Sequence, residues 1–557
     1  MQGAASSVPP LDKDLRPAGR RDAPYMPTDG AICMGLSYTP WHRMTCLWWR
    51  PWLLIAALLV MVRADDNELQ LGKNDYQTFV TRPEIEALAW NIEVHDERAL
   101  SPGYWFVQPY QKLEQNARKF KWIGPHIFDR HGTLIWSGAY LTLGHNTFDF
   151  RATEVLGEQM LTFLLPHADI GMVLDNRYQI RYTIKLATEP GFSTDMHELR
   201  FVDNGTRALF FTDNTLNAGK KECREAGFGD NRCRVKEGLV RQLDLTRNLE
   251  EVSRWSSLEH VTMGENSMLD VRREGQCPDP GNPGGWDYLH PNSLDKFPDD
   301  GSILMSARHT SGIYKIAPDG SIVWRLGGVK SDFRADFTFA RQHTASIVEH
   351  NSTHTKISLF DNGQAIVQDR PTAKWSRSMI VLLQTDVRPM TATLLAEYPH
   401  PDGAQAPRVF ARGSTQVLPN GNVFTGWVHA CQHSEYTAEG KLVMQARMNH
   451  FDIKTYRAYK FPFVGKPGVP PDVYSTAVSG NARTRVKTVV YVSWNGATEV
   501  ASWHLFKTNE RGESEQPGKA VGSVAKTAFE TVIEYSGLAS FVVVEARDRK
   551  GHVLGKS

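Results

Sequence analysis

Short runs of alternating hydrophobic and polar residues extend from about residue 90 to 480, separated by Asp-Gly and Asn-Gly turns. Alternation with a period of two, bounded by such turns, predicts β-hairpins. No long stretch sustains the 3.6-residue period of an amphipathic helix. The pattern therefore predicts an all-β protein.

Two short sequence forms recur within this region. One is Gly132-Thr-Leu-Ile-Trp136, repeated at Gly320-Ser-Ile-Val-Trp324 and, more weakly, at Gly440-Lys-Leu-Val-Met444. The other is Asp203-Asn-Gly-Thr, repeated at Asp300-Gly-Ser and Asn420-Gly-Asn. The spacing of the first form fits a unit of roughly sixty residues, close to a four-stranded propeller blade. We expect a six-bladed β-propeller over residues 90–480. A pair of β-sandwiches is the alternative, but it would not explain the recurring turn and Trp.

The pattern changes after Pro470-Pro471. Four further strand-like runs, Val486 to Trp494, Glu499 to Phe506, Ala528 to Tyr535 and Phe541 to Ala546, follow within a short segment. They predict a small immunoglobulin- or fibronectin-like β-sandwich over residues 485–557. Residues 65–89 are expected to form an N-terminal arm.

One apolar run, Trp52 to Val62, lies near the N-terminus. It is shorter than the about 20 residues of a membrane-spanning helix but fits the core of a secretory signal. Val62-Arg63-Ala64 follows as a cleavage site, so we expect residues 1–64 to be an N-terminal extension and signal peptide, with translation starting at Met44 or Met34. The expected product is secreted and has no stable membrane span. An uncleaved signal-anchor is the alternative.

The composition excludes some classes of protein. With 63 Lys+Arg, 62 Asp+Glu and 41% hydrophobic residues, the chain is too apolar for a disordered protein. A balanced charge also argues against a nucleic-acid partner. Asn204-Gly-Thr and Asn351-Ser-Thr are N-glycosylation sequons, which fit an exported protein.

Four cysteines follow the predicted signal: Cys223, Cys233, Cys277 and Cys431. An even number in an exported chain favours disulfides. Cys223 and Cys233 flank a short polar loop and are expected to pair, which leaves Cys277 with Cys431 by elimination. A zinc site is the alternative, but no Cys-x-x-Cys or His-x-x-x-His cluster accompanies these residues. We therefore expect neither a metal nor a cofactor.

Polar residues interrupt several apolar strands, and five of them have side chains that could bind the same ligand. In a propeller the inner strand of each blade lines a central channel, so residues far apart in the sequence converge there. Together these five residues would offer three imidazoles, a fixed cation and an amide to a tetrahedral oxyanion such as sulfate. They are His197, His290, Asn292, Arg308 and His343. His309, next to Arg308, is expected to point to the opposite face of its strand.

The segments that carry these residues resemble the arylsulfotransferase family of β-propellers, in particular its secreted fungal branch. They are His290-Pro-Asn292-Ser-Leu, Ser306-Ala-Arg308-His309 and Arg341-Gln-His343-Thr-Ala, followed by Leu359-Phe-Asp-Asn-Gly363. The resemblance implies that His343 is the nucleophile that is transiently sulfated. It assigns binding and acid/base roles to His290 and His197, and contacts with the sulfuryl group to Asn292 and Arg308.

The function implied is transfer of a sulfuryl group from an aryl sulfate ester to a phenol through a sulfohistidine. The sequence has no Gly-rich phosphate loop with Lys, as an adenylyl-sulfate donor would be expected to require. The expected partners are therefore a small aryl sulfate and a phenol. Two alternatives are an aryl sulfate hydrolase on the same scaffold and a non-catalytic secreted propeller that binds a ligand or mediates adhesion.

Overall fold

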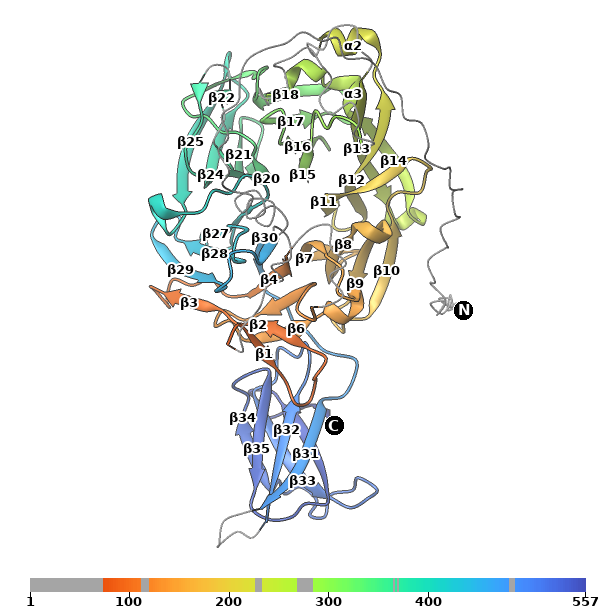
Figure 1. The fold of residues 1–557 in the computed structure, drawn as a ribbon, viewed down its shortest axis with the longest axis vertical. Helices are drawn as coiled ribbons and strands as arrows, with labels where there is room; N and C mark the ends of the chain where they lie inside the picture. Colours follow the sequence, from red (N-terminus) through yellow and green to blue (C-terminus); the bar gives the residue numbers. More distant parts are fainter. Residues whose placement is uncertain are drawn as a thin grey trace, which may run out of the picture. The chain divides into compact units, whose positions relative to one another are not determined.

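The structure is a computed structural model of the 557-residue chain, and its elements can be followed in Figure 1. It describes residues 74–111, 120–225, 233–267, 284–363, 366–367, 370–479 and 486–557. The predicted signal peptide and its cleavage site lie outside these residues. Within them, no helix has both the length and the apolar character needed to cross a membrane.

The described part of the chain is built from β-strands, which confirms the all-β prediction. Its helices are single turns or little more, and the longest described one is α2, Lys220–Glu225. The chain forms strands because its hydrophobic and polar residues alternate, and alternate side chains of a strand face opposite sides of a sheet.

Between residues 91 and 461 the described strands form six sheets of four or five strands, almost all antiparallel, and one two-stranded sheet of β22 (Ile366–Val367) and β23 (Arg370–Pro371). The first consists of β7 (Phe148–Val155), β8 (Glu158–Leu165), β9 (Ile170–Leu174) and β10 (Ile180–Lys185). The second consists of β11 (Phe192–Val202), β12 (Arg207–Asn217), β13 (Arg234–Asp244) and β14 (Glu250–Ser256). The third consists of β15 (Pro291–Lys296), β16 (Ile303–Ala307), β17 (Gly312–Ile316) and β18 (Ile322–Gly327).

The other three sheets include short or distant strands. The fourth contains β19 (Phe333–Ala335), β20 (His343–His350), β21 (His354–Asp361), β24 (Arg377–Gln384) and β25 (Met390–Pro399), with β19 parallel to β25. The fifth contains β26 (Ser414–Val417), β27 (Val423–Gly426), β28 (His433–Tyr436), β29 (Leu442–Arg447) and β3 (Asn91–Val94). The sixth contains β30 (Lys454–Phe461), β4 (Tyr104–Tyr110), β5 (His126–Phe128) and β6 (Leu134–Ser137).

The two recurring sequence forms mark equivalent turns in different sheets. Gly132, Gly320 and Gly440 have positive φ and precede β6, β18 and β29, each the fourth strand of its sheet. Gly205, Gly301 and Gly421 also have positive φ and precede the second strands β12, β16 and β27. The recurring sequence forms therefore mark equivalent hairpin turns. These turns favour glycine, because a residue without a Cβ adopts a positive φ at no steric cost.

N-terminal strands complete the last two sheets. β3 pairs with β29, with Val94 opposite Met444, and β4 pairs with β30, with Tyr110 opposite Lys454. Each of the six sheets has one edge strand, called here its first strand, that contacts the first strands of the two neighbouring sheets. In order these strands are β7, β11, β15, β20, β26 and β30, and β30 contacts β7 again. These six strands therefore form a closed cycle.

Five of these six first strands carry a register shift. In β15 it lies between Pro291 and Ser293, and in β20 between His343 and Ser346. In β11 it lies between Thr194 and Leu199. A bulge bends its strand and redirects the side chains beside it. The residues predicted for the site lie at or next to these bulges.

The C-terminal residues form two further sheets that share one apolar core. One contains β31 (Asp472–Ser479), β32 (Val486–Ser493) and β35 (Glu530–Tyr535). The other contains β34 (Gly522–Ala525), β33 (Ser502–Thr508), β36 (Phe541–Arg547) and β37 (Val553–Lys556). Because β31 pairs with β32, it belongs to these sheets and not to the region 90–480 where the sequence placed it. In the predicted N-terminal arm, β1 (Tyr76–Thr78) pairs with β2 (Glu86–Leu88).

The structure contradicts the predicted disulfides. Cys223 and Cys431 carry free thiols, and both are fully buried. The thiol of Cys223 donates toward the carbonyl of Ala218 at 4.0 Å, and burial raises the pKa of Cys431. Both side chains pack in apolar clusters as small hydrophobic groups, so neither the pairing with Cys233 nor the pairing with Cys277 is formed. Cys277 itself lies outside the described residues.

Both predicted glycosylation sites lie on the surface. Asn204 and Asn351 are exposed, the first in a turn and the second at the end of β20.

Two buried histidines predict a loss of stability in acid. Burial lowers the pKa of His126 to about 4 and that of His433 to about 3, whereas a histidine of the unfolded chain titrates near about 6.5. Below pH 6.5 the unfolded chain therefore binds more protons than the folded one, so acid favours unfolding. We expect the free energy of unfolding to fall by roughly 1 kcal/mol per pH unit for each histidine between about pH 6.5 and 4.

Urea unfolding measured across this pH range tests the prediction. His433→Phe should make the dependence on pH shallower, while the exposed His131→Gln should leave it unchanged. An unchanged slope in His433→Phe would contradict the assignment.

Candidate active site

Three of the predicted histidines come together from neighbouring sheets. His197 lies in β11, His290 immediately precedes β15, and His343 begins β20. The ring centre of His197 is 4.8 Å from that of His290 and 6.4 Å from that of His343. His197 and His343 are buried, whereas the side chain of His290 is 27% exposed. Substrate could therefore reach His290 from solvent.

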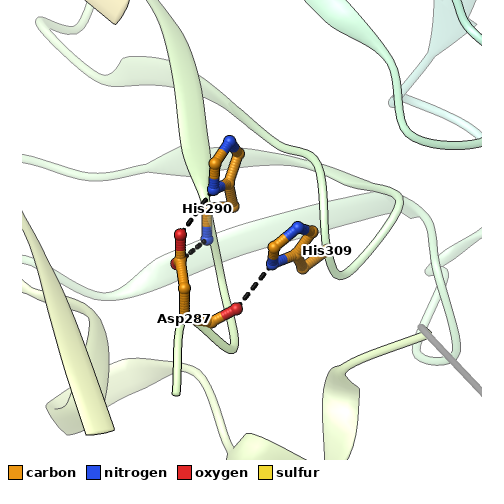
Figure 2. A group of neighbouring side chains, drawn as sticks. All are labelled: Asp287, His290 and His309. Atoms are coloured by element: carbon orange, nitrogen blue, oxygen red, sulfur yellow. Dashed lines mark hydrogen bonds and ion pairs between the residues drawn. The ribbon is translucent and has the colours of Figure 1, made fainter. Parts of the chain in front are cut away.

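His290 is paired with a carboxylate. Its Nδ1 lies 2.5 Å from Asp287 Oδ2, and its backbone N–H donates to Oδ1 of the same residue at 3.1 Å (Figure 2). Burial is the largest single influence on Asp287 and opposes its ionisation, but His290, His309 and Lys236 together outweigh burial and lower the pKa of the carboxyl. The carboxylate fixes the proton on Nδ1, which leaves Nε2 available for chemistry.

His197 is held in the same way. Its Nδ1 lies 2.6 Å from Asp195 Oδ1, which also accepts its backbone N–H at 2.8 Å. Burial nevertheless lowers the pKa of His197, although Asp195 opposes this shift. The site thus contains two Asp–His pairs side by side.

The hydrogen bonds of His343 define its protonation. The Nδ2 of Asn362 donates to the carbonyls of Val409 and Arg412, so its Oδ1 must accept the bond from His343 Nδ1, at 2.7 Å. The proton therefore sits on Nδ1, and Nε2 accepts the backbone N–H of Arg412 at 3.0 Å. Burial, and repulsion from His197 and Arg308, keep the pKa of His343 well below its usual value. His343 is a neutral imidazole whose Nε2 carries a lone pair, held in a hydrogen bond by the Arg412 N–H until Nε2 reacts.

Strand alternation predicted that His309 would point away from the site, and this prediction is wrong. Strand β16 ends at Ala307, so His309 lies in a turn where the alternation no longer applies. Its ring stacks on that of His290 at 4.5 Å. Its Nδ1 donates to the backbone carbonyl of Asp287 at 2.5 Å, as Figure 2 shows, and its Nε2 faces Arg308 Nη1 at 2.6 Å.

Asp287, His290 and His309 also place potential metal-ligand atoms within 4.8 Å of one another. However, both ring nitrogens of His309 are already used, one by a carbonyl and the other by the guanidinium of Arg308. Hydrogen bonds account for the cluster, and we assign no metal to it.

The two predicted non-histidine residues lie at the same place. Asn292 is fully buried, and its Nδ2 donates to the carbonyl of Gln342 at 2.8 Å, next to His343. Arg308 donates to the carbonyl of Phe410 at 3.1 Å, and its Nε is buried without a hydrogen-bond partner. Burial and the neighbouring cations lower the pKa of Arg308 to about 10, so it remains charged at neutral pH.

A buried ionic network joins the strands that carry the site residues. Arg457 in β30 is fully buried and donates to the backbone carbonyl of Asn292 at 2.6 Å. It also pairs with Asp149 at 2.7 Å and with Glu198, the neighbour of His197, at 2.9 Å. Arg151 binds the same two carboxylates. We call these four residues the buried ionic network; it connects the strands that carry His197 and Asn292.

Several of these residues were not among the predicted site residues. The spacing Asp195-Met-His197 and Asp287-Tyr-Leu-His290 could have indicated the two carboxylates, because both residues of each pair lie within one short turn or bulge. Asn362, Arg412 and Arg457 had no such local signal, since each is far from its partner in the sequence.

Comparison with known proteins identifies the family. A family model described as arylsulfotransferase (ASST) matches residues 168–449, a range that holds all five predicted site residues. No curated protein matches the chain. Similar solved structures include a protein of unknown function from Bacteroides caccae, 13% identical, covering 65% of this chain and 99% of that one with a TM-score of 0.36. Virginiamycin B lyase from Staphylococcus aureus is 9% identical and covers 77% and 99% with a TM-score of 0.27. The match over half of the sequence shows that the chain belongs to the arylsulfotransferase family.

Proposed function

We propose that the protein transfers a sulfuryl group from an aryl sulfate ester to a phenol, without a nucleotide donor. Family membership supports the general activity. The observation that carries the proposal is the geometry of the three histidines: a neutral His343 with its lone pair on Nε2 lies close to two Asp–His pairs and to Arg308.

We propose that the six sheets are the blades of a six-bladed β-propeller and that the C-terminal sheets form a β-sandwich. The cyclic contacts of the first strands support the propeller, and the shared apolar core supports the sandwich. The site would then lie where the innermost strands of neighbouring blades meet. The protein would be exported, as expected of the secreted fungal branch.

In the first half-reaction, His343 Nε2 attacks the sulfur of the donor. The N–S bond forms as the bond between sulfur and the aryl oxygen breaks, and the departing oxygen takes the proton from Nε2 of protonated His290. Asp287 stabilises the protonated imidazole beforehand. The products are a phenol and a sulfated His343.

In the second half-reaction, the acceptor phenol gives its proton to His290 Nε2, and its oxygen attacks the sulfur. The N–S bond breaks and its electron pair returns to His343 Nε2. Charge develops on the sulfuryl oxygens in both steps, as in phosphoryl transfer. We propose that Arg308 and Asn292 stabilise it, and that His197 does so when its Nε2 also carries a proton.

The backbone N–H of Arg412 would change partner during the cycle. In the resting enzyme it donates to His343 Nε2. Once Nε2 is bonded to sulfur it can no longer accept, and the N–H is then free to donate to a sulfuryl oxygen. This exchange would keep one hydrogen bond in both states.

Turnover of 4-nitrophenyl sulfate with and without a phenol tests the proposal. We expect release of 4-nitrophenol that depends on the acceptor and forms the sulfated acceptor. Release of inorganic sulfate without an acceptor would indicate the hydrolase instead. The absence of any turnover by folded protein would favour the non-catalytic alternative.

A further inference from the structure

Three arginines lie together beside the histidines, more than one sulfuryl group requires. Arg308 follows β16, Arg341 lies just before β20 and Arg412 just before β26. The guanidinium of Arg308 donates to the carbonyl of Phe410, two residues before Arg412. The backbone N–H of Arg412 donates to His343 Nε2, and Arg341 lies two residues before His343. Burial lowers the pKa of Arg308, and repulsion from Arg341 and Arg412 lowers it further, in agreement with this placement. We call the three arginines the arginine triad.

The triad has no carboxylate partner of its own among the described residues. No ion pair joins any of the three to an acid, and the Nε atoms of Arg308 and Arg341 are buried without hydrogen bonds. Asp287 is the carboxylate that acts on Arg308, but it is bonded to His290. Among the described residues, the positive charge of the triad therefore has no ion-pair partner of its own.

The backbone holds two of the arginines in fixed positions. Arg341 and Arg412 have φ of 56° and 69°, a left-handed conformation that non-glycine residues adopt only rarely. The N–H of Arg341 donates to Ser311 Oγ at 3.3 Å, and the guanidinium of Arg412 lies 5.3 Å from the centre of the Tyr110 ring. Both residues are thereby held beside His343, which lies two positions after Arg341 and accepts the backbone N–H of Arg412.

We infer that the aryl substrate carries a carboxylate on its ring, bound by Arg341 and Arg412. The inference rests on the proposed function. The sulfuryl group of an aryl sulfate has a single negative charge, which Arg308 already matches. Guanidinium groups bind carboxylates through paired, charge-assisted hydrogen bonds, and two such groups would balance a second anion at the far end of the ring.

A matched pair of donors tests the inference: 4-carboxyphenyl sulfate and its methyl ester. We expect the native enzyme to favour the acid over the ester in kcat/KM by about tenfold or more, since a charged hydrogen bond contributes this much. The preference should shrink as the salt concentration rises, because salt screens partly exposed charges.

Two variants locate the preference. Arg341→Met and Arg412→Met keep an aliphatic side chain and should each lower the ratio of acid to ester by about tenfold. Arg247→Met, an exposed arginine on a turn, is the matched control and should leave the ratio as it is. Thermal unfolding of each variant shows whether it is folded. Because the result is the ratio of kcat/KM for the two donors, a loss of activity that affects both donors equally cancels out.

A ratio near one in the native enzyme, unaffected by salt, would overturn the inference even if the variants fail to fold. Failure of the proposed function gives a different result, because neither donor would then be turned over. In that case calorimetry with 4-hydroxybenzoate and its methyl ester decides. Tighter binding of the acid, lost in Arg412→Met, supports the carboxylate site, and equal binding of the two overturns it.

Discussion

Replacing His343 by glutamine is expected to lower kcat for sulfuryl transfer by roughly 10³-fold or more, because the covalent route is lost. His343 is only 1% exposed and bonded to Asn362, so alanine would leave a cavity and an unpaired amide. Glutamine can still donate an N–H to Asn362 Oδ1, and the variant should stay folded. The exposed His131→Gln is the matched control and should retain full activity.

Mass spectrometry identifies the nucleophile independently of the rates. Native protein mixed with an aryl sulfate in the absence of acceptor should carry an adduct of about 80 Da, the mass of SO₃, on the peptide that contains His343. His343→Gln should carry none. An adduct on His290, whose Nε2 has no partner within the described residues, would show that the nucleophile has been misassigned.

Replacing Arg457 by methionine is expected to lower the free energy of unfolding by about 3–5 kcal/mol. Its side chain is 0% exposed, and its removal leaves Asp149 and Glu198 buried with Arg151 as their remaining ion-pair partner among the described residues. Arg254 offers a matched control, since it also pairs with two carboxylates, Glu189 and Glu251. It is 38% exposed, so Arg254→Met should cost no more than about 1 kcal/mol.

Urea unfolding of the two variants measures this difference, and kinetics measures its effect on the site. Because Arg457 binds the carbonyl of Asn292 and the neighbour of His197, kcat should fall in Arg457→Met and recover in part in Arg457→Lys. Equal losses of stability in Arg457→Met and Arg254→Met would show that burial does not set the strength of these pairs.

The sequence was sufficient to predict that three histidines would gather, although it missed the residues that hold them, Asp195, Asp287 and Asn362. His197, His290 and His343 lie in different sheets, yet each interrupts an apolar strand or begins one, and that pattern is visible in the sequence. The recurring glycines were equally informative, because a positive φ at a hairpin turn restricts the residue locally. Both signals are short-range, which is why one sequence can reveal them.

The sequence could not predict interactions that depend on the packing of distant segments. Asn362 orients His343, and Arg457 supports Asn292, across many residues of intervening chain. The direction of His309 depends on β16 ending one residue before Arg308, a boundary that alternation alone cannot locate. The predicted disulfides failed for a related reason: loop length suggests which cysteines can meet, but not that their thiols pack into apolar clusters.

The pairing of β3 with β29 and of β4 with β30 has a consequence for biosynthesis. Two of the first strands to be synthesised must wait for their partners until almost the whole cycle of sheets has been translated, a delay on the order of tens of seconds. During this interval their edges are unpaired and able to associate with other chains. Joining ends so distant along the chain also carries a large entropic cost, so closure should be a late and slow event. A nascent chain truncated before β29 should therefore aggregate or bind chaperones, whereas one that extends past β30 should become resistant to protease.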